Sequence, residues 1–170
     1  LGVAQEQLTY YAITHSPAGR CSHFALLPSL SADKHVRVGR SYEFSPRMSD
    51  LRLCVTRAKG KYAHLGFSEI FFGRDDGLNE KGLCITMSAG AHGVTTREGG
   101  LRFWAVIRTA LDTCADVEEA IDLFLRTPIS FHANFLLADR AGRAALIEVA
   151  CSRKAVKRIG TGSGSGESWL

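Results

Sequence analysis

The sequence lacks the features typical of membrane, secreted and nucleic-acid-binding proteins. No apolar stretch approaches the roughly 20 residues needed to cross a bilayer, because Arg, His or Gly interrupts the longest apolar runs. The first seven residues include Gln5, Glu6 and Gln7, so they do not show the charged-then-apolar layout of a secretory signal. The net charge is only +4, and the basic residues are scattered rather than gathered in a stripe with stacking rings. We therefore expect a cytoplasmic protein that binds neither membranes nor nucleic acid.

The sequence also lacks a Cys-x-x-Cys pair, although it contains five cysteines. This absence argues against a zinc knuckle or ribbon, and we expect no metal and no cofactor. An odd number of cysteines without a secretory signal indicates a reducing compartment and free thiols. Cys54, Cys84 and Cys114 stand among apolar residues, so we interpret them as small core side chains. Cys21 has different neighbours and is considered below.

Length and periodicity predict a globular α+β fold. The 170 residues, 45% of them hydrophobic and 22% charged, suit one domain or a large piece of one. Two amphipathic helices are predicted, over 101–112 and 117–126, the second with Asp116 as its N-cap. The first helix is expected to bury Trp104, Ile107, Ala110 and Leu111. Strands are predicted at 8–14, 21–27, 36–44, 51–56, 62–72, 83–87, 131–138 and 144–150, the last two as a hairpin.

This order of strands, helices and strands predicts antiparallel sheets with the helices covering one face. The densest basic stretch, 153–158, is interpreted as a solvated strand face. The segment 160–167 is a flexible low-complexity loop, and the last three residues are typical of the start of another strand. The sequence has no Met at position 1. We therefore expect chain both before residue 1 and after residue 170.

Three short segments suggest chemistry only when they are taken together. They are Gly-Arg-Cys-Ser-His-Phe at 19–24, Gly-Arg-Ser-Tyr-Glu-Phe at 39–44 and Gly-Leu-Asn-Glu-Lys-Gly-Leu at 77–83. Alone, each has an ordinary structural interpretation: a buried strand cysteine, a strand with an exposed ion, and a hairpin turn. A fourth segment, Asn-Phe-Leu-Leu-Ala-Asp at 134–139, is followed by Gly142 and by Ile-Glu at 147–148.

In this order the segments resemble the N-terminal half of the choloylglycine hydrolase and penicillin acyltransferase group of N-terminal nucleophile hydrolases. The more similar branch is that of acyl-coenzyme A:6-aminopenicillanate acyltransferase. The resemblance implies a four-layer αββα sandwich with antiparallel sheets, of which this chain supplies only a part. It also implies that residues 1–20 are a propeptide or upstream segment. Residues 21–170 would then be the N-terminal part of one domain that continues beyond the chain.

The resemblance implies that Cys21 becomes the nucleophile once the peptide bond before it is broken. A free α-amine has a pKa of about 7.7–8.0, so it can act as general base for the side chain of its own residue. Arg40, in the family's arginine position, would favour the thiolate. Glu43 would orient the α-amine, and the backbone N–H of Ser88 or Ala89 would serve the oxyanion. The family's second oxyanion donor, an Asn side chain, would lie after residue 170.

Two positions depart from the family pattern. Glu43 stands where the family has Asp, and Ser41 stands where it has Asn. One extra methylene moves a carboxylate by roughly one bond length, in a site that needs positioning within about 0.5 Å. Three functions therefore stay open. They are an amidohydrolase or acyltransferase acting on linear amides, a catalytically inactive family member, and a small-ligand-binding α+β domain.

The partners implied by the resemblance are a small acyl amide or acyl donor and the remaining part of the same protein. A homo-oligomeric assembly stays open, because nothing in the sequence decides it. The acyl group, and the choice between hydrolysis and acyl transfer, are likewise open, since both reactions proceed through an acyl-cysteine intermediate.

Overall fold

The computed structural model describes residues 21–43, 52–68, 73–90, 99–150 and 153–159. The strand expected at 8–14, the proposed propeptide, the loop 160–167 and Cys151 lie outside the described residues.

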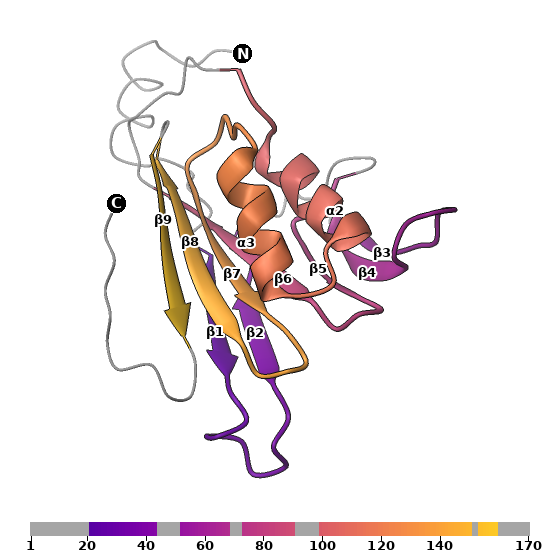
Figure 1. The fold of residues 1–170 in the computed structure, drawn as a ribbon, viewed down its shortest axis with the longest axis vertical. Coiled ribbons are helices and arrows are strands. Elements are labelled where there is room, and N and C mark those ends of the chain that lie inside the picture. The colour runs from indigo at the N-terminus through magenta and orange to yellow at the C-terminus, as the bar shows by residue number, and fades with distance from the viewer. Residues whose placement is uncertain (1–20, 44–51, 69–72, 91–98, 151–152, 160–170) are drawn as a thin grey trace, which may run out of the picture.

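Nine described strands form two antiparallel sheets (Figure 1). The small sheet pairs β1 (Ser22–Leu26) with β2 (Arg37–Ser41). The large sheet has seven strands whose order follows the sequence: β3 (Arg52–Thr56), β4 (His64–Ser68), β5 (Asp76–Asn79), β6 (Cys84–Ala89), β7 (Ala133–Ala138), β8 (Ala144–Ala150) and β9 (Arg153–Ile159). The helices α2 (Phe103–Thr113) and α3 (Val117–Arg126) connect β6 to β7. The predicted α+β class and antiparallel pairing are confirmed.

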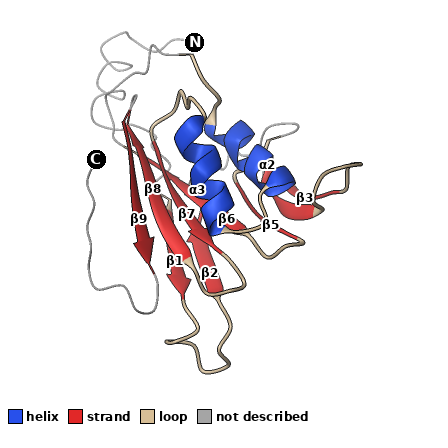
Figure 2. Cartoon of the chain, in the orientation of Figure 1, coloured by secondary structure: helices blue, strands red, loops and turns tan. Residues whose placement is uncertain are grey.

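Both helices pack on one face of the large sheet, α2 over β4–β6 and α3 over β7 and β8 (Figure 2). The helix α3 has the predicted bounds, and the Asp116 side chain accepts a hydrogen bond from the Glu119 N–H at 3.0 Å. The expected apolar stripe of α3 is buried in full: Val117, Ala120, Ile121 and Phe124. Because that stripe repeats every three or four residues, it lies against the sheet.

The stripe of α2 differs from the predicted one at a single residue. Ile107, Ala110 and Leu111 are buried as expected, but the fourth buried residue is Val106. Trp104 is half-buried and packs over Gly73, where an added Cβ would lie 2.7 Å from the Trp104 Cβ. The helix is therefore oriented with the small β-branched side chain of Val106 toward the core. The larger Trp104 ring packs over Gly73 instead.

The segment 77–83 is not a single turn, as its glycines suggested, because β5 extends through Asn79. The Asn79 amide donates hydrogen bonds to the carbonyls of Leu111, at 3.0 Å, and Cys114, at 2.7 Å. Its oxygen accepts from the N–H groups of Lys81 and Leu83. Gly82 has φ +92°, a conformation that residues with a Cβ rarely adopt. Asn79 thus closes a short hairpin and ties it to the end of α2.

The two-stranded sheet packs on the opposite face of the large sheet, against β6 and β7 (Figure 2). Alternate residues of β6 therefore face different layers. Ile85 and Met87 belong to the core beneath the helices, whereas Thr86 faces the two-stranded sheet and contacts His23. The layers run helix, sheet, sheet.

Candidate active site

Arg40 is the centre of a polar cluster between the two sheets. Its Nη2 donates to the Sγ of Cys21 at 3.8 Å, and its Nη1 lies 3.2 Å from the Oδ2 of Asp76. Its Nε donates to the Met87 carbonyl at 3.3 Å, and its guanidinium carbon lies 4.6 Å from the centre of the Tyr42 ring. The guanidinium is therefore engaged on three nitrogens and one face. The Arg40 side chain is 7% exposed, so little water screens its charge.

Strand pairing explains why these residues meet. In the small sheet, His23 is the register partner of Arg40, and in the large sheet Asp76 is the register partner of Thr86. Partners in an antiparallel pair project from the same face. Two contacts then join the sheets: Arg40 to Asp76, and the His23 Nδ1 to the Thr86 Oγ1 at 3.0 Å. Cys21 directly precedes β1, so these contacts fix where its thiol lies.

The two titratable partners of Arg40 have shifted pKa values. Burial raises the pKa of Asp76, against the opposing effects of the hydrogen bond from the Phe67 N–H and of the Arg40 charge. Burial, followed by the Arg40 charge, lowers the pKa of His23. Neutral imidazole is therefore the favoured form of His23 at neutral pH. Arg40 remains the cation that faces the thiol.

Among the described residues, the Glu43 side chain is seen to contact Ser41 and not Cys21 or Arg40. Glu43 follows the end of β2, is exposed, and accepts a hydrogen bond from the Ser41 hydroxyl at 3.2 Å. These two residues are the positions at which the chain departs from the family pattern. The orienting role expected of Glu43 stays a prediction.

The backbone positions expected to serve the oxyanion lie at the end of β6. Ser88 is buried and Ala89 half-buried, and they pair in register with Asn134 and Ala133 of β7. Ser88 directly follows Met87, whose carbonyl accepts from Arg40. Arg40 thus links Cys21 to this end of β6. The role of Ser88 and Ala89 remains a prediction.

The cysteines differ more than their apolar neighbours suggested. Among the four described cysteines, Cys114 is buried as a core residue, whereas Cys21, Cys54 and Cys84 are half-buried. The core interpretation of Cys54 and Cys84 was therefore wrong. Burial, with a smaller effect from the Asp76 charge, raises the pKa of Cys84 to about 12. A thiol with such a pKa is protonated at neutral pH and unreactive. Cys21 is the cysteine to which Arg40 donates.

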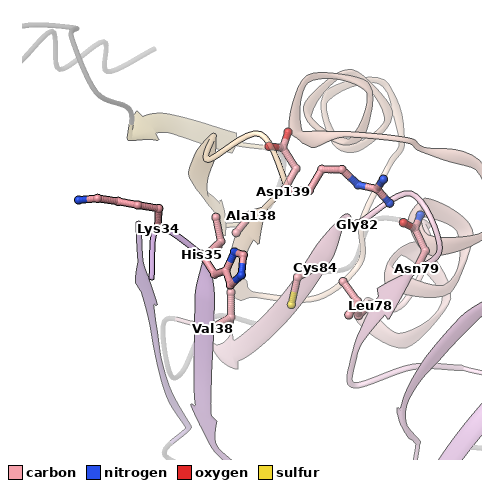
Figure 3. A pocket seen from close by; sticks show the side chains of 11 residues that line it. Lys34, His35, Val38, Leu78, Asn79, Gly82, Cys84, Ala138 and Asp139 are labelled. Carbon is pink, nitrogen blue, oxygen red and sulfur yellow. The ribbon is translucent and has the colours of Figure 1, made fainter. Parts of the chain in front are cut away.

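An open cavity of about 540 Å³ lies at the other end of the two-stranded sheet (Figure 3). Its lining includes Val38, Leu78 and Cys84, together with Lys34 and His35 from the segment before β2. Cys21 adjoins the Ser22–Ser41 end of the β1–β2 ladder, whereas the cavity is lined from β2 by Val38, nearer the Leu26–Arg37 end. The cavity is therefore separate from the cluster around Arg40.

The described residues contain no group of three or more His, Cys, Asp or Glu side chains suited to hold a metal ion. Nor is any helix within the described ranges long and apolar enough to cross a membrane.

Asp76 and Thr86 were missed by sequence reasoning. Asp76 directly precedes the segment 77–83, which was interpreted as a hairpin turn, and Thr86 lies inside a strand interpreted only as buried. The available signal was the spacing of polar residues along β6, where Thr86 and Ser88 alternate with Ile85 and Met87.

The arrangement of layers is shared with solved amide hydrolases. A mutant of the conjugated bile acid hydrolase from Clostridium perfringens superposes with a TM-score of 0.67 at 17% identity, covering 82% of this chain and 51% of that one. The Caenorhabditis elegans ortholog of N-acylethanolamine-hydrolyzing acid amidase gives a TM-score of 0.61 at 16% identity, covering 82% and 64%. The chain spans about half the length of the bile acid hydrolase. Its fold is part of the antiparallel αββα sandwich of the N-terminal nucleophile hydrolases.

Residues 31–165 match the family model of acyl-coenzyme A:6-aminopenicillanic acid acyl-transferase. The match covers most of the chain, and the protein belongs to this family. Cys21 lies before the matched residues, whereas Arg40, Glu43, Asp76 and Ser88 lie within them. No curated protein sequence matches the chain.

Proposed function

We propose that the protein hydrolyses a linear amide, or transfers its acyl group, with Cys21 as the nucleophile after the peptide bond preceding Cys21 is cleaved. The observation that carries this proposal is the hydrogen bond from Arg40 to the Cys21 thiol, at the head of the first described strand. A guanidinium held in a buried position stabilises a thiolate beside it. Family membership supports acyl transfer as the reaction class.

The chemistry follows from an N-terminal cysteine. The α-amine takes the thiol proton, and the thiolate attacks the amide carbonyl carbon. The tetrahedral intermediate collapses as the α-ammonium returns the proton to the departing amine, which leaves an acyl-cysteine. Water, or a second amine, then attacks the thioester and releases the thiol. Water gives hydrolysis and the amine gives acyl transfer.

The oxyanion of the intermediate requires preorganised donors. We assign one of them to the backbone N–H of Ser88 or Ala89, which lie at the end of β6 that Arg40 links to Cys21. No side chain among the described residues is assigned as the second donor.

The substrate class is a small molecule in which an acyl group is joined to an amine. The names of the relatives share this chemistry: one acts on conjugated bile acids, another on N-acylethanolamines, and the family on an acyl-coenzyme A with 6-aminopenicillanic acid. An acyl thioester is therefore a second candidate donor for the acyl group.

A second candidate is a catalytically inactive family member. The observation in its favour is Glu43, whose carboxylate is exposed and accepts from Ser41. In an inactive protein no carboxylate is needed to orient an α-amine, and the Arg40 cluster would serve only to join the two sheets.

N-terminal sequencing of the purified protein, combined with an amidase assay, separates the two candidates. The first predicts a mature chain that begins at Cys21, and the second predicts that residue 20 stays joined to it. The Cys21→Ala variant should remain uncleaved, whereas Cys54→Ala, which removes a half-buried thiol from β3, should be cleaved as the parent is. An active protein that retains residues 1–20 would contradict the proposal.

A further inference from the structure

A buried carboxylate holds the cation that contacts Cys21. The Asp76 side chain is 13% exposed, and its Oδ2 lies 3.2 Å from the Arg40 Nη1. Its other oxygen, Oδ1, accepts the Phe67 N–H at 3.0 Å. The Asp76 carboxylate is therefore fixed from the β4 side and has one oxygen left for Arg40. A buried carboxylate is costly unless a cation and hydrogen bonds compensate it, and here both are present.

The guanidinium of Arg40 is planar, so fixing two of its nitrogens fixes the direction of the third. Asp76 engages Nη1 and the Met87 carbonyl engages Nε, which leaves Nη2 directed at the Cys21 thiol. The second contact between the sheets, His23 to Thr86, holds the strand beside Arg40 but does not touch the guanidinium.

We propose that Asp76 is a positioning residue, whose carboxylate holds the Arg40 guanidinium in the orientation that contacts the Cys21 thiol. The inference rests on the function proposed above, because it deepens the site in which Cys21 is the nucleophile. Asp76 acts through Arg40 and has no assigned contact with the substrate.

A purely electrostatic role for Asp76 would have the opposite effect on the thiol. A negative charge near Cys21 disfavours the thiolate, so removing that charge alone would make Cys21 more reactive. If Asp76 instead holds Arg40 in place, its removal lets the guanidinium turn away, and Cys21 becomes less reactive. The direction of the change therefore decides between the two roles.

The test is the rate at which iodoacetamide labels each cysteine at pH 7, measured by mass spectrometry of the separated peptides. In Asp76→Asn, which keeps the shape of the side chain and removes its charge, we expect Cys21 to be labelled about tenfold more slowly, as for a thiolate that loses an adjacent cation. An equal or faster rate at Cys21 would overturn the proposal.

Asp33→Asn is the matched control. Asp33 pairs with Arg37 on the same strand as Arg40, with an Oδ2 to Nη2 distance of 2.6 Å, but the pair is exposed and lies at the far end of the ladder. Its loss should leave the labelling of Cys21 unchanged. Buried Cys114 reports on folding, because it reacts only when the core opens.

Asp76→Glu decides the matter if Asp76→Asn fails to fold. Glutamate keeps the charge and displaces the carboxylate by roughly one bond length, so a positioning role predicts slower labelling of Cys21 here too. Labelling at the parent rate, or loss of the fold in both variants, would overturn the proposal. Labelling needs neither substrate nor cleavage before Cys21. If residue 20 stays attached while the rates change as expected, the proposed function fails and the positioning role stands.

Discussion

The two faces of the seven-stranded sheet are built from different kinds of side chain. The face beneath α2 and α3 is closed and mainly apolar: Phe135 of β7 is fully buried under the helices, as are Leu111 and Phe124 of the helices themselves. Its polar groups, Asn79 and the pair of His64 with Asp112, bind α2. The opposite face carries the Arg40 cluster where the two-stranded sheet covers it. Farther along, over β3–β5, it exposes apolar side chains: Leu53, Val55, Leu65, Phe67 and Leu78.

We infer from this difference that the helix-side face mainly stabilises the fold, whereas the opposite face carries the reactive groups. Dense apolar packing contributes most of the free energy of folding, while buried charges cost desolvation and are retained where they do something else. Alternation along β6 lets one strand serve both purposes, since Ile85 and Met87 enter the core while Thr86 and the Met87 carbonyl serve the other layer. Changes on the helix face should therefore alter stability, and changes on the other face should alter reactivity.

The largest effect is expected at Cys21. Cys21→Ala should lower amide hydrolysis or acyl transfer by at least about 10⁴-fold, because nothing replaces the nucleophile. The free energy of unfolding of this variant should differ from that of the parent by less than about 0.5 kcal/mol, as for a typical surface substitution. Steady-state kinetics and urea unfolding measure the two quantities. Activity that survives this substitution would remove Cys21 from the reaction.

On the helix face, Phe124→Ala should lower stability and leave the reactivity of Cys21 unchanged. The ring is fully buried and packs edge-on against Phe135, with centroids 4.7 Å apart. Its loss leaves a cavity and should lower the free energy of unfolding by about 3–5 kcal/mol. Below the melting temperature, the iodoacetamide labelling rate of Cys21 should not change. A slower rate at Cys21 in a folded variant would show that the two faces are coupled.

Asn79 lies in a segment that resembles the family, yet it contacts the helix side of the sheet. Its substitution therefore tests whether that side affects stability rather than reactivity. Asn79→Ala leaves the carbonyls of Leu111 and Cys114 without their amide donor and should cost about 1–3 kcal/mol of unfolding free energy. Because Asn79 serves α2 rather than Arg40, kcat/KM should stay within about threefold of the parent value, a change of under 1 kcal/mol. Asn79→Asp, which keeps the acceptor oxygen and removes the donor, is the matched variant. A large loss of kcat/KM at unchanged stability would assign Asn79 to the reaction.

Local patterns predicted the helix face well and the site less well. The cap at Asp116 and the stripe of α3 depend on neighbours three or four residues apart, so the sequence alone contains them. The Arg40 cluster joins residues 36 positions apart, Arg40 and Asp76, through the stacking of two sheets, and no local periodicity encodes that. Glu43 was assigned by its place in a motif, but β2 ends at Ser41, which leaves its side chain exposed.

The smallest effect is expected at Asp116, whose carboxylate differs from that of Asp76 in the direction of its pKa shift. The pKa of Asp116 is lowered, first by the hydrogen bond from the Glu119 N–H and also by the charge of Arg143, which lies 3.0 Å away. A lowered pKa means that the ionised form stabilises the fold. This stability is present above the unfolded-state pKa of about 3.8 and is lost as the pH falls through the native value. Burial raises the pKa of Asp76, so for that residue the sign is reversed.

Asp116→Asn isolates the charge, because asparagine caps a helix about as well as aspartate. We expect it to lower the free energy of unfolding at pH 7 by about 0.3–1 kcal/mol, the usual size of a charge at a helix N-terminus. The difference from the parent should begin to shrink as the pH falls below about 3.8 and reach zero below the lowered native pKa, where the aspartate is neutral in the folded state as well. Urea unfolding at a series of pH values measures it. A difference that persists unchanged at low pH would mean that the side-chain geometry at this cap, rather than its charge, stabilises the helix face.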